Sequence, residues 1–269
     1  MPRPHIEFVQ SQYLPFVGGA LGGARSALAA KVLSRDSESG ATSSVLRVPP
    51  GWRGEGAIAT DEEFLVLEGD VTINGQTLGP FGYAHVPKGA STTLSSTHGA
   101  IAVWFLDAVP SATPVGPFDP ARRVVLDAMS VPYTGNFHPE FPGGAGRKWL
   151  FRDPAGGEET WLLGTMALRN AARPEVHPVV EEMFLLAGEV HGDRGIMRPG
   201  AYFWRPPGLA HGPFGTRTGN LYLFRTIGGP LATSYIDSDR AFRWDPPYDP
   251  ALPPELEFAR GEVPRPLNW

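Results

Sequence analysis

Apolar residues along this chain come in short runs, and glycine or proline interrupts almost every run. The segments Ile101–Leu106 and Leu221–Phe224 are typical, since each ends at a charged residue after only a few apolar positions. Runs of this length match β-strands and are too short for helices of ordinary length. With 33 Gly and 29 Pro in 269 residues, long helices are unfavourable throughout. The pattern therefore predicts an all-β fold.

The pattern of strands occurs twice along the chain. Three pairs of segments match between its two halves, and two of the pairs share an offset of 119 residues (181 against 62, and 206 against 87). Two unrelated matches at one offset are difficult to obtain by chance, so they indicate an internal duplication. The matching pairs are Lys31–Asp36 with Lys148–Asp153, Glu62–Gly69 with Glu181–Gly188, and Pro87–Gly89 with Pro206–Gly208.

A proline-rich segment, Val109–Pro120, separates the two repeats. Its prolines cannot donate the hydrogen bonds of a regular strand ladder, so we expect an extended connector. The predicted domains are therefore residues 1–118 and residues 119–269. In the first domain, His5–Val9 is expected to form a short edge strand. The tail Trp244–Trp269 holds aromatic residues between prolines, and we expect it to pack across the body or onto a second subunit.

Charge and composition exclude several functions. The formal net charge is -5 and the basic residues are scattered, so nucleic acid is not an expected partner. No apolar stretch approaches the roughly 20 residues that cross a bilayer, and Met1–His5 lacks the features of a secretory signal. We therefore expect a soluble, cytoplasmic protein without a membrane partner. The absence of cysteine excludes disulfides, thiolate nucleophiles and cysteine metal ligands.

Residues 175–211 hold two histidines and a carboxylate at metal-ligand spacing. His177 can lie on a strand with Glu181 one step downstream across a bend, and His211 returns after a Pro-x-Gly turn. Three such side chains can converge on one ion, and the donor set suits Fe(II), Mn(II), Ni(II) or Zn(II). Glu175 precedes His177 by two residues, so on a strand both side chains point to one face. Glu175 is therefore either a fourth ligand or an acid or base beside the metal.

This stretch resembles the two motifs of the cupin superfamily, G(X)5HXH(X)3-4E(X)6G and G(X)5PXG(X)2H(X)3N. The positions that fit are His177, Glu181 and Gly188 in the first motif, and Gly200, Pro206, Gly208 and His211 in the second. Together with the duplication, the resemblance implies a bicupin, which contains two tandem antiparallel β-barrels of the jelly-roll type in one chain.

The chain departs from the cupin motifs at several positions. In the second repeat, Glu175 replaces the first histidine and Gly215 replaces the closing asparagine. In the first repeat, Ile58 and Thr92 replace the two histidines, and only Glu62 is kept, as a remnant that is exposed or hydrogen-bonded. The resemblance thus implies one divalent metal ion per chain, in the C-terminal barrel. Fe(II) is the first choice, and Zn(II), Mn(II) and Ni(II) are alternatives.

The resemblance implies a metal-dependent oxidoreductase of the dioxygenase type. Its substrate would be a small oxygenated molecule such as a diketone, hydroxyketone or phenolic compound, with Glu175 or Glu181 taking the proton. The same site could run a lyase, isomerase or decarboxylase reaction without O2. A non-enzymatic sensor, similar to zinc-binding cupins of the anti-sigma-factor type, and a structural dimer without a reaction are further alternatives.

Three aromatic side chains are candidates for the pocket wall: Phe184, Tyr202 and Trp204. Tyr202 and Trp204 share one face of their predicted strand, opposite Phe203 and Arg205. The expected partners are a small-molecule substrate and a second copy of the chain in a homodimer. Three other histidines are expected on solvated turns without a functional role: His85, His98 and His191.

Overall fold

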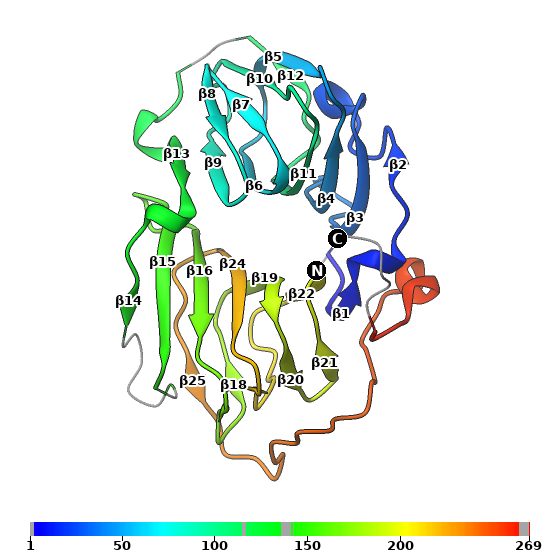
Figure 1. Cartoon of the computed structure of the whole chain (residues 1–269), viewed down its shortest axis with the longest axis vertical. Helices are drawn as coiled ribbons and strands as arrows, with labels where there is room; N and C mark the ends of the chain where they lie inside the picture. The colour runs from blue at the N-terminus through cyan, green and yellow to red at the C-terminus, as the bar shows by residue number, and fades with distance from the viewer. Residues whose placement is uncertain (1–2, 115–116, 136–140, 142, 264–268) are drawn as a thin grey trace. The chain divides into compact units, whose positions relative to one another are not determined.

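The computed structural model describes residues 3–114, 117–135, 141, 143–263 and 269. The regular elements in these residues are β-strands and short 3-10 helices, which confirms the predicted all-β fold. Contacts within the chain divide it into two compact units. Unit 1 comprises Met1–Pro4 and Leu14–Val131, and unit 2 comprises His5–Tyr13 and Pro132–Trp269. Each unit is an antiparallel β-barrel of the jelly-roll type (Figure 1).

Unit 1 is built from a seven-stranded and a five-stranded sheet. In sheet order, the larger contains β13 (Val124–Asp127), β9 (Gly82–Val86), β6 (Glu62–Gly69), β11 (Ala100–Leu106), β4 (Thr42–Val48), β3 (Ala29–Arg35) and β2 (Val17–Gly18). The smaller contains β12 (Ala112–Thr113), β5 (Arg53–Ile58), β10 (Thr92–Ser95), β7 (Val71–Ile73) and β8 (Gln76–Leu78). The 3-10 helices of this unit are η2 (Gly23–Arg25), η3 (Pro120–Arg122) and η4 (Ala128–Ser130).

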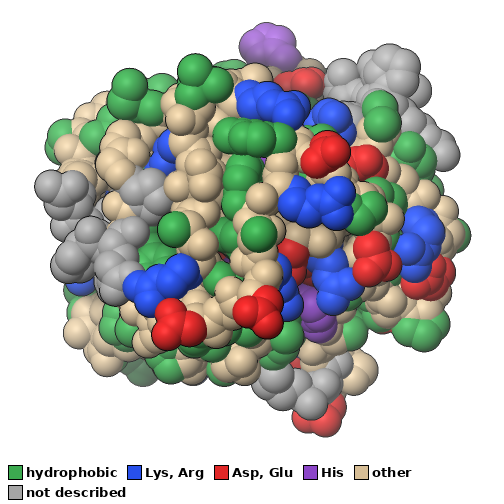
Figure 2. Space-filling view, turned by 90° about the horizontal axis from the view of Figure 1, so that it is seen from below, with side chains coloured by type: hydrophobic (Ala, Val, Ile, Leu, Met, Phe, Trp, Pro, Cys, Tyr) green, Lys and Arg blue, Asp and Glu red, His purple; other side chains and the backbone are tan. Residues whose placement is uncertain are grey.

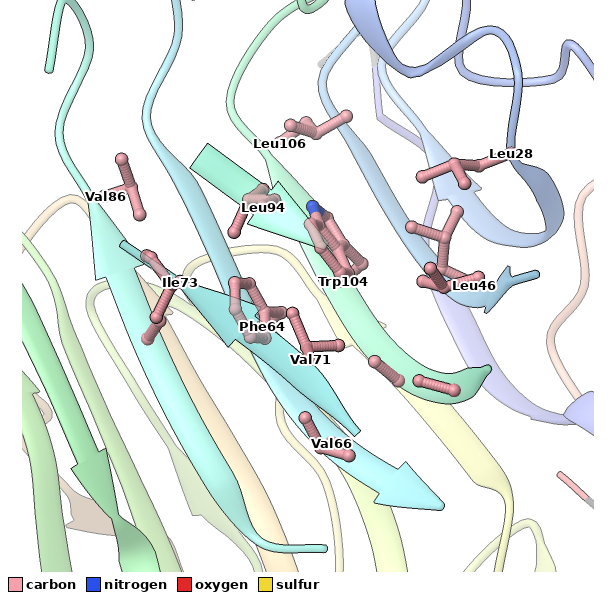
Figure 3. Packing of buried hydrophobic residues seen from close by; sticks show 14 of the residues in the cluster. Leu28, Leu46, Phe64, Val66, Val71, Ile73, Val86, Leu94, Trp104 and Leu106 are labelled. Carbon is pink, nitrogen blue, oxygen red and sulfur yellow. The ribbon is translucent and has the colours of Figure 1, made fainter. Parts of the chain in front are cut away.

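The two sheets of unit 1 enclose an apolar core (Figure 3). Phe64 and Val66 lie two residues apart on β6 and share a face, as the period of a strand requires. They meet Trp104 of β11, and the rings of Phe64 and Trp104 stack with their centroids 4.4 Å apart. Ile73 and Leu94 reach the same core from the smaller sheet. Apolar side chains therefore fill the space between the sheets of unit 1.

Unit 2 is built from sheets of seven, four and two strands. In sheet order, the largest contains β1 (Ile6–Gln10), β22 (Ala201–Arg205), β19 (Val180–Gly188), β24 (Asn220–Ile227), β16 (Glu159–Thr165), β15 (Ala145–Arg152) and β14 (Thr134–Gly135). The second contains β17 (Arg169–Asn170), β23 (Gly215–Thr216), β20 (Val190–Gly192) and β21 (Gly195–Met197), and the third contains β18 (Glu175–Val176) and β25 (Ser234–Tyr235). The 3-10 helices are η1 (Ser11–Tyr13) and η5 (Pro254–Ala259).

Both units carry the same two β-bulges, which supports the predicted duplication. In unit 1 the strand register shifts at Leu33 of β3 and at Leu67 of β6. In unit 2 it shifts at Leu150 of β15 and at Leu186 of β19. The offsets are 117 residues (150 against 33) and 119 residues (186 against 67), as in the matching segments. A bulge is a specific local feature of a fold, so two shared bulges indicate a common origin of the barrels.

The edge of the seven-stranded sheet comes from a different part of the chain in each unit. In unit 1, β13 pairs with β9. In unit 2, the corresponding place beside β22 is taken by β1, from the start of the chain (Figure 1). His5–Val9 thus contributes to an edge strand, as predicted, but in the second unit. The chain divides after Val131 instead of after residue 118, and the proline-rich connector also contributes the short strand β12.

The C-terminal tail packs across unit 2, which is one of the two predicted alternatives. Ala251 exchanges two backbone hydrogen bonds with Glu7, at 2.8 and 2.7 Å, along the edge of β1. The ring of Tyr248 lies 5.3 Å from that of Phe8. An open strand edge can pair with another chain, so the tail covers an edge that β1 would otherwise present.

The surface shown in Figure 2 has interspersed charges. Lys and Arg side chains lie close to Asp and Glu side chains on this face, and apolar side chains lie among them. This face has no continuous basic area, in agreement with the scattered basic residues of the sequence. Within the described part of the chain, no helix is long and apolar enough to span a bilayer.

Gly69 and Gly188 occupy the same tight position in the two units. Their φ angles are +74° and +76°, and a Cβ at either would lie 1.9 Å from the carbonyl oxygen of Gly99 or Gly219. We expect Gly69→Ala and Gly188→Ala each to lower the free energy of unfolding by about 3 kcal/mol in denaturant titrations. Gly51→Ala is the control, because Gly51 has φ +74° with no atom near its Cβ position; it should cost about 1 kcal/mol. Equal losses at Gly51 and Gly69 would contradict the role of the close approach.

Candidate metal centre

Backbone pairing brings three candidate ligands of unit 2 together. Glu175 lies on β18, and His177 directly follows that strand. Glu175 and His211 form an antiparallel bridge, in which each N–H donates to the other's carbonyl oxygen, at 2.9 and 3.0 Å. The Gly208 N–H of the Pro-x-Gly turn donates to the His177 carbonyl oxygen at 2.8 Å. The spacing of the two sequence motifs thus places these three side chains next to one another.

Each of the two histidines has one ring nitrogen bound to a backbone carbonyl. His177 Nδ1 lies 3.0 Å from the oxygen of Ala232, and His211 Nδ1 lies 2.9 Å from that of Leu209. A carbonyl oxygen only accepts, so Nδ1 carries the proton and Nε2 of the neutral ring keeps a lone pair. Both Nε2 atoms are buried and have no hydrogen-bond partner among the described residues. Buried, unprotonated imidazole nitrogens of this kind are suited to bind a metal ion.

The carboxylates of Glu175 and Glu181 face these nitrogens. His211 Nε2 lies 3.7 Å from Glu175 Oε1 and 3.5 Å from Glu181 Oε2. His177 Nε2 lies 3.6 Å from Glu181 Oε1. Ligand atoms that are each about 2.1 Å from one ion are roughly 3 to 4 Å apart. Glu175, His177 and His211 also offer one ligand atom each within 4.8 Å of one another. The donor set therefore fits a divalent metal ion, with Glu175 as a candidate ligand.

A buried arginine holds Glu181. Arg205 Nη1 donates to Glu181 Oε2 at 2.6 Å, while its Nε and Nη2 donate to the two oxygens of Glu7 at 2.5 Å. Burial would raise the pKa of Glu7, but the charge and hydrogen bonds of Arg205 lower it to about 2. Burial would lower the pKa of Arg205, yet the two carboxylates raise it above its ordinary value. Glu181 therefore has one oxygen on Arg205 and directs the other toward His177.

Glu175 is held in its ionised form. Burial would raise its pKa, but electrostatic interactions with His211, His177 and Arg205 lower the pKa below its ordinary value. The charge of Glu175 in turn adds to burial in raising the pKa of Tyr235, which pairs with it on β25. An anionic oxygen next to two imidazoles is a suitable ligand for a divalent cation.

Part of this donor set lines a cavity of about 100 Å³. That volume accommodates several water molecules or a small organic molecule. Glu175, His177, Glu181 and Arg205 lie on its wall. Apolar side chains form much of the remaining wall, and they include Trp161, Leu163, Val190, Met197, Phe203 and Phe224.

The three aromatic residues expected at the pocket wall lie elsewhere. Phe184, Tyr202 and Trp204 are not among the described residues that line the cavity, whereas Phe203 and Arg205 are. Tyr202 instead donates its hydroxyl hydrogen to Glu182 Oε1 at 2.6 Å. The alternation along this strand was predicted, but the inward face is the opposite one, because a period of two defines two faces and not their direction.

Four charged residues at or beside the cavity were not predicted as site residues. Arg205 could have been found from its strand, since it shares a face with Phe203. Arg147 could have been found by comparing the repeats, because the matched position in the first repeat, directly before Lys31, is Ala30. Neither Arg169 nor Glu7 carries a comparable signal in the sequence.

Unit 1 has the same backbone pairing and turn as the candidate site of unit 2, but not its candidate ligands. Gly56 and Thr92 pair in the sheet where Glu175 and His211 pair in unit 2. The Gly89 N–H donates to the carbonyl oxygen of Ile58 at 2.9 Å, as in the turn of unit 2. The side chain of Ile58 joins the apolar core. The turn and the strand pairing thus persist although the candidate ligand side chains are replaced.

The carboxylate retained in unit 1 is neutralised by an arginine. Both oxygens of Glu62 accept hydrogen bonds from Arg25, each at 2.6 Å, and Trp104 Nε1 donates to Oε1 at 2.8 Å. Glu62 is fully buried, so the hydrogen-bonded alternative of the two predicted for it is confirmed. The Arg25 guanidinium supplies there the positive charge that an ion would supply in unit 2.

Two of the three histidines expected on solvated turns are buried. His191 lies on β20, with Nδ1 2.8 Å from the Trp244 carbonyl oxygen and Nε2 2.9 Å from Glu189 Oε1. His85 is buried on β9. Only His98, with its side chain 82% exposed, has the predicted environment. The prediction was wrong for the other two because their strands were interpreted as turns: His191 lies on a strand of three residues and His85 on a strand of five.

The jelly-roll barrels and the inward-facing histidines define the class of the protein, which has the cupin fold. A family model described as a domain of unknown function, DUF4437, matches residues 17–229. The chain therefore belongs to the DUF4437 family. A search of curated proteins finds no match.

Several solved structures share the fold. A protein from Nostoc punctiforme PCC 73102 described as a "putative dioxygenase" has a TM-score of 0.75 and 18% identity, over 88% of this chain and 92% of that one. A Pseudomonas aeruginosa protein described as a "putative glyoxylate induced protein" has a TM-score of 0.61 and 13% identity, over 90% of this chain and 92% of that one. Bacillus subtilis oxalate decarboxylase, which has Mn(II) centres, has a TM-score of 0.57 and 10% identity, over 86% and 79%.

The depressed pKa of Glu7 predicts a pH-dependent stability. Its folded pKa is about 2, against 4.5 for the ordinary carboxyl group, so the stabilisation is complete above pH 4.5 and is lost as the pH falls toward 2. We expect Glu7→Gln to lower the free energy of unfolding at pH 7 by about 3 kcal/mol. Denaturant titrations from pH 7 to pH 3 should show the difference from wild type shrinking below pH 4.5.

The exposed Glu55 provides the control for this measurement. Glu55→Gln should change the free energy of unfolding by no more than about 0.5 kcal/mol at any pH, because its ion pair with Arg53 lies in solvent. A Glu7→Gln effect that stays constant down to pH 3 would show that the carboxylate charge is not what stabilises the fold.

Proposed function

We propose that the chain is a bicupin enzyme with one divalent metal ion in unit 2, acting on a small oxygenated organic molecule. The observation that carries this proposal is the pair of buried Nε2 atoms on His177 and His211, which face two carboxylates at the wall of a cavity. A histidine with a structural role in this chain, His191, has both ring nitrogens hydrogen-bonded. The two site histidines lack that second partner, and an ion would provide it.

The ion would be held by Glu175, His177 and His211, with Glu181 Oε1 as a fourth donor. Fe(II) is the first choice, with Mn(II), Zn(II) and Ni(II) as alternatives. A bound divalent ion would hold the oxygen atoms of the substrate and lower the pKa of an adjacent C–H or O–H group. Glu175 and Glu181 are the candidate bases for that proton, and the one that does not bind the ion would take it up; Arg205 fixes the position of Glu181. The apolar wall formed by residues such as Trp161 limits the access of water.

Dioxygenation is the reaction that we propose first. A set of histidine and carboxylate ligands with open positions is the arrangement that non-haem iron oxygenases use. The Nostoc punctiforme neighbour, which is described as a putative dioxygenase, shares the fold of this chain and supports the same proposal. The substrates expected for a dioxygenase of this kind are diketones, hydroxyketones and phenolic compounds.

A reaction without O2 is the second candidate. The same donor set can stabilise negative charge on a substrate during a lyase, isomerase or decarboxylase reaction. Bacillus subtilis oxalate decarboxylase, a manganese protein with this fold, is the observation that favours it. The homodimer and the cytoplasmic location stay predictions from the sequence.

The proposed site predicts how metal content responds to substitution. We expect the purified chain to take up one divalent ion per chain, measured by elemental analysis after dialysis. His177→Ala and His211→Ala should each weaken metal affinity at least about tenfold, because each removes one ligand from a small set. Glu175→Gln should weaken it as well, because Glu175 is one of the proposed ligands.

His98→Ala and Thr92→Ala are the controls. His98 is an exposed histidine of unit 1, and Thr92 is the unit 1 counterpart of His211, so neither change should alter metal content. The proposed site is incorrect if His177→Ala and His211→Ala retain the metal as the wild type does.

The two candidate reactions give different gas exchange. With the metal-loaded chain and 2,4-pentanedione or catechol, dioxygenation should consume O2 in proportion to the substrate lost, as followed with an oxygen electrode. Decarboxylation should instead release CO2 from a small carboxylic acid without net O2 uptake. The His177→Ala variant should show neither activity. Tightly bound zinc together with no turnover of any of these compounds would favour the sensor alternative.

A further inference from the structure

Two uncharged polar groups on the cavity wall have no partner within the fold. Trp161 on β16 and Thr216 on β23 both line the cavity that contains His177. Both side chains are buried. Neither Nε1 of Trp161 nor Oγ1 of Thr216 has a hydrogen-bond partner among the described residues. A buried donor or acceptor without a partner costs free energy, so these two groups indicate a partner from outside the chain.

The indole ring of Trp161 is held by contacts with its faces. The ring of Phe224 stacks on it, with the centroids 5.5 Å apart and an interplanar angle of 11°. The guanidinium of Arg147 lies over the same indole, 4.8 Å from the ring centroid. The Nε1–H bond lies in the plane of the ring and points outward from its edge, and it can only donate. The face contacts therefore position the ring without satisfying the N–H group.

The strand β23 directs the side chain of Thr216 inward. The preceding residue is Gly215, and a Cβ at Gly215 would lie 2.4 Å from the ring of Phe242, which is not among the described residues that line the cavity. Neighbouring residues of a strand point to opposite faces, so Thr216 points away from Phe242 and toward the cavity. Its hydroxyl group can donate or accept a hydrogen bond. Trp161 and Thr216 thus reach the cavity from two different sheets of unit 2.

In unit 1 a corresponding indole N–H is bound within the fold. Trp104 pairs with Phe64 of β6, as Phe224 pairs with Met183 of β19, so Trp104 and Phe224 occupy equivalent positions. The Trp104 Nε1–H donates to Glu62 Oε1 at 2.8 Å. The barrel without the histidines therefore satisfies its buried indole from its own side chains.

The position of Trp161 itself holds a serine in unit 1. Ser44 pairs with Trp104 as Trp161 pairs with Phe224. The Ser44 hydroxyl donates to the carbonyl oxygen of Trp104 at 3.2 Å. The barrel therefore forms without an indole at this position, and the indole occurs in the unit that has the histidines. This difference separates a ligand-binding role of Trp161 from a role in the fold.

We propose that Trp161 and Thr216 determine substrate specificity, with the Trp161 N–H donating to a substrate oxygen that the ion does not hold and the Thr216 hydroxyl forming a second hydrogen bond. This inference rests on the proposed function of the same site. Among the proposed substrates it selects a small aliphatic hydroxyketone with a further hydroxyl group, because a hydroxyl can accept from an indole and donate to a threonine. The cavity volume of about 100 Å³ limits such a molecule to a few heavy atoms.

Two probes of nearly equal size and shape test the inference. Dihydroxyacetone and 1-hydroxy-2-butanone have the same number of non-hydrogen atoms, and a hydroxyl group of the first replaces a methyl group of the second. In calorimetric titrations of the metal-loaded full chain, dihydroxyacetone should bind at least about fivefold more tightly, because the methyl group leaves the indole N–H unpaired. Trp161→Phe should reduce this ratio to less than about twofold, and Thr216→Val should lower it as well, with metal content unchanged.

Matched variants separate the hydrogen bonds from changes in packing. Trp161→Phe also shortens the side chain, so 3-benzothienylalanine in place of Trp161 serves as a second variant, which keeps the shape of the ring and lacks the N–H. It should reduce the ratio as Trp161→Phe does, and it provides the same comparison if circular dichroism shows that Trp161→Phe is unfolded. Thr160→Val is the control for Thr216→Val, because Thr160 also has a buried Oγ1 without a partner among the described residues but does not line the cavity.

The control at the other indole is Trp104→Phe. This change removes the N–H that Glu62 accepts in unit 1, so it should lower the midpoint of denaturation and leave the ratio of the two probe affinities as in the wild type. Thr160→Val should leave the ratio unchanged too.

The outcomes distinguish this inference from the proposed function. If the wild type binds the two probes equally or binds neither, or if the ratio persists in both variants of Trp161, the specificity assignment is wrong even when the metal is present. If the chain takes up no metal but the preference for dihydroxyacetone still depends on Trp161, the proposed enzyme function fails and the binding role of Trp161 stands.

Discussion

A buried guanidinium between two carboxylates is the interaction on which unit 2 depends. Removing Arg205 from water costs several kcal/mol, and that cost is offset only when its charge is paired. Glu7 comes from β1 and Glu181 from β19, so the interaction links the edge strand to the strand that carries a candidate ligand. It also determines which oxygen of Glu181 is directed toward His177. The packing of the sheet and the geometry of the centre therefore depend on one another.

The two units neutralise a buried glutamate at matching positions in different ways. Each has a glutamate at one position of a buried strand, and each must neutralise it. Unit 1 uses Arg25 and adds an indole N–H from Trp104, which closes the space with a large side chain. Unit 2 uses Arg205 for one oxygen and leaves the rest of the site facing a cavity. One copy of the duplicated barrel is thus specialised for packing, and the other keeps room for a ligand.

The fold, the duplication and the histidines could be predicted because they depend on local features. Strand periodicity, the turn at Gly208 and the ligand spacing can each be recognised from residues that lie within a few tens of positions of one another in the sequence. The inward face of β22 could not be predicted, since alternation separates Phe203 from Tyr202 without giving a direction. The partner of β1 could not be predicted either, because Glu7 and Arg205 are 198 residues apart. The predicted domain boundary followed the proline-rich segment, although β12 within that segment and β13 after it still pair within unit 1.

The position of β1 has a consequence for the order in which the chain is assembled during translation. β22 ends 195 residues after β1 does (205 against 10), so at the usual rate of synthesis roughly 10 to 40 s separate the two strands. Unit 1 is complete in the interval, but the first strand of unit 2 has no partner until residue 205 of 269 has been synthesised. The barrel that contains the candidate metal centre therefore closes last, around a strand that was synthesised first.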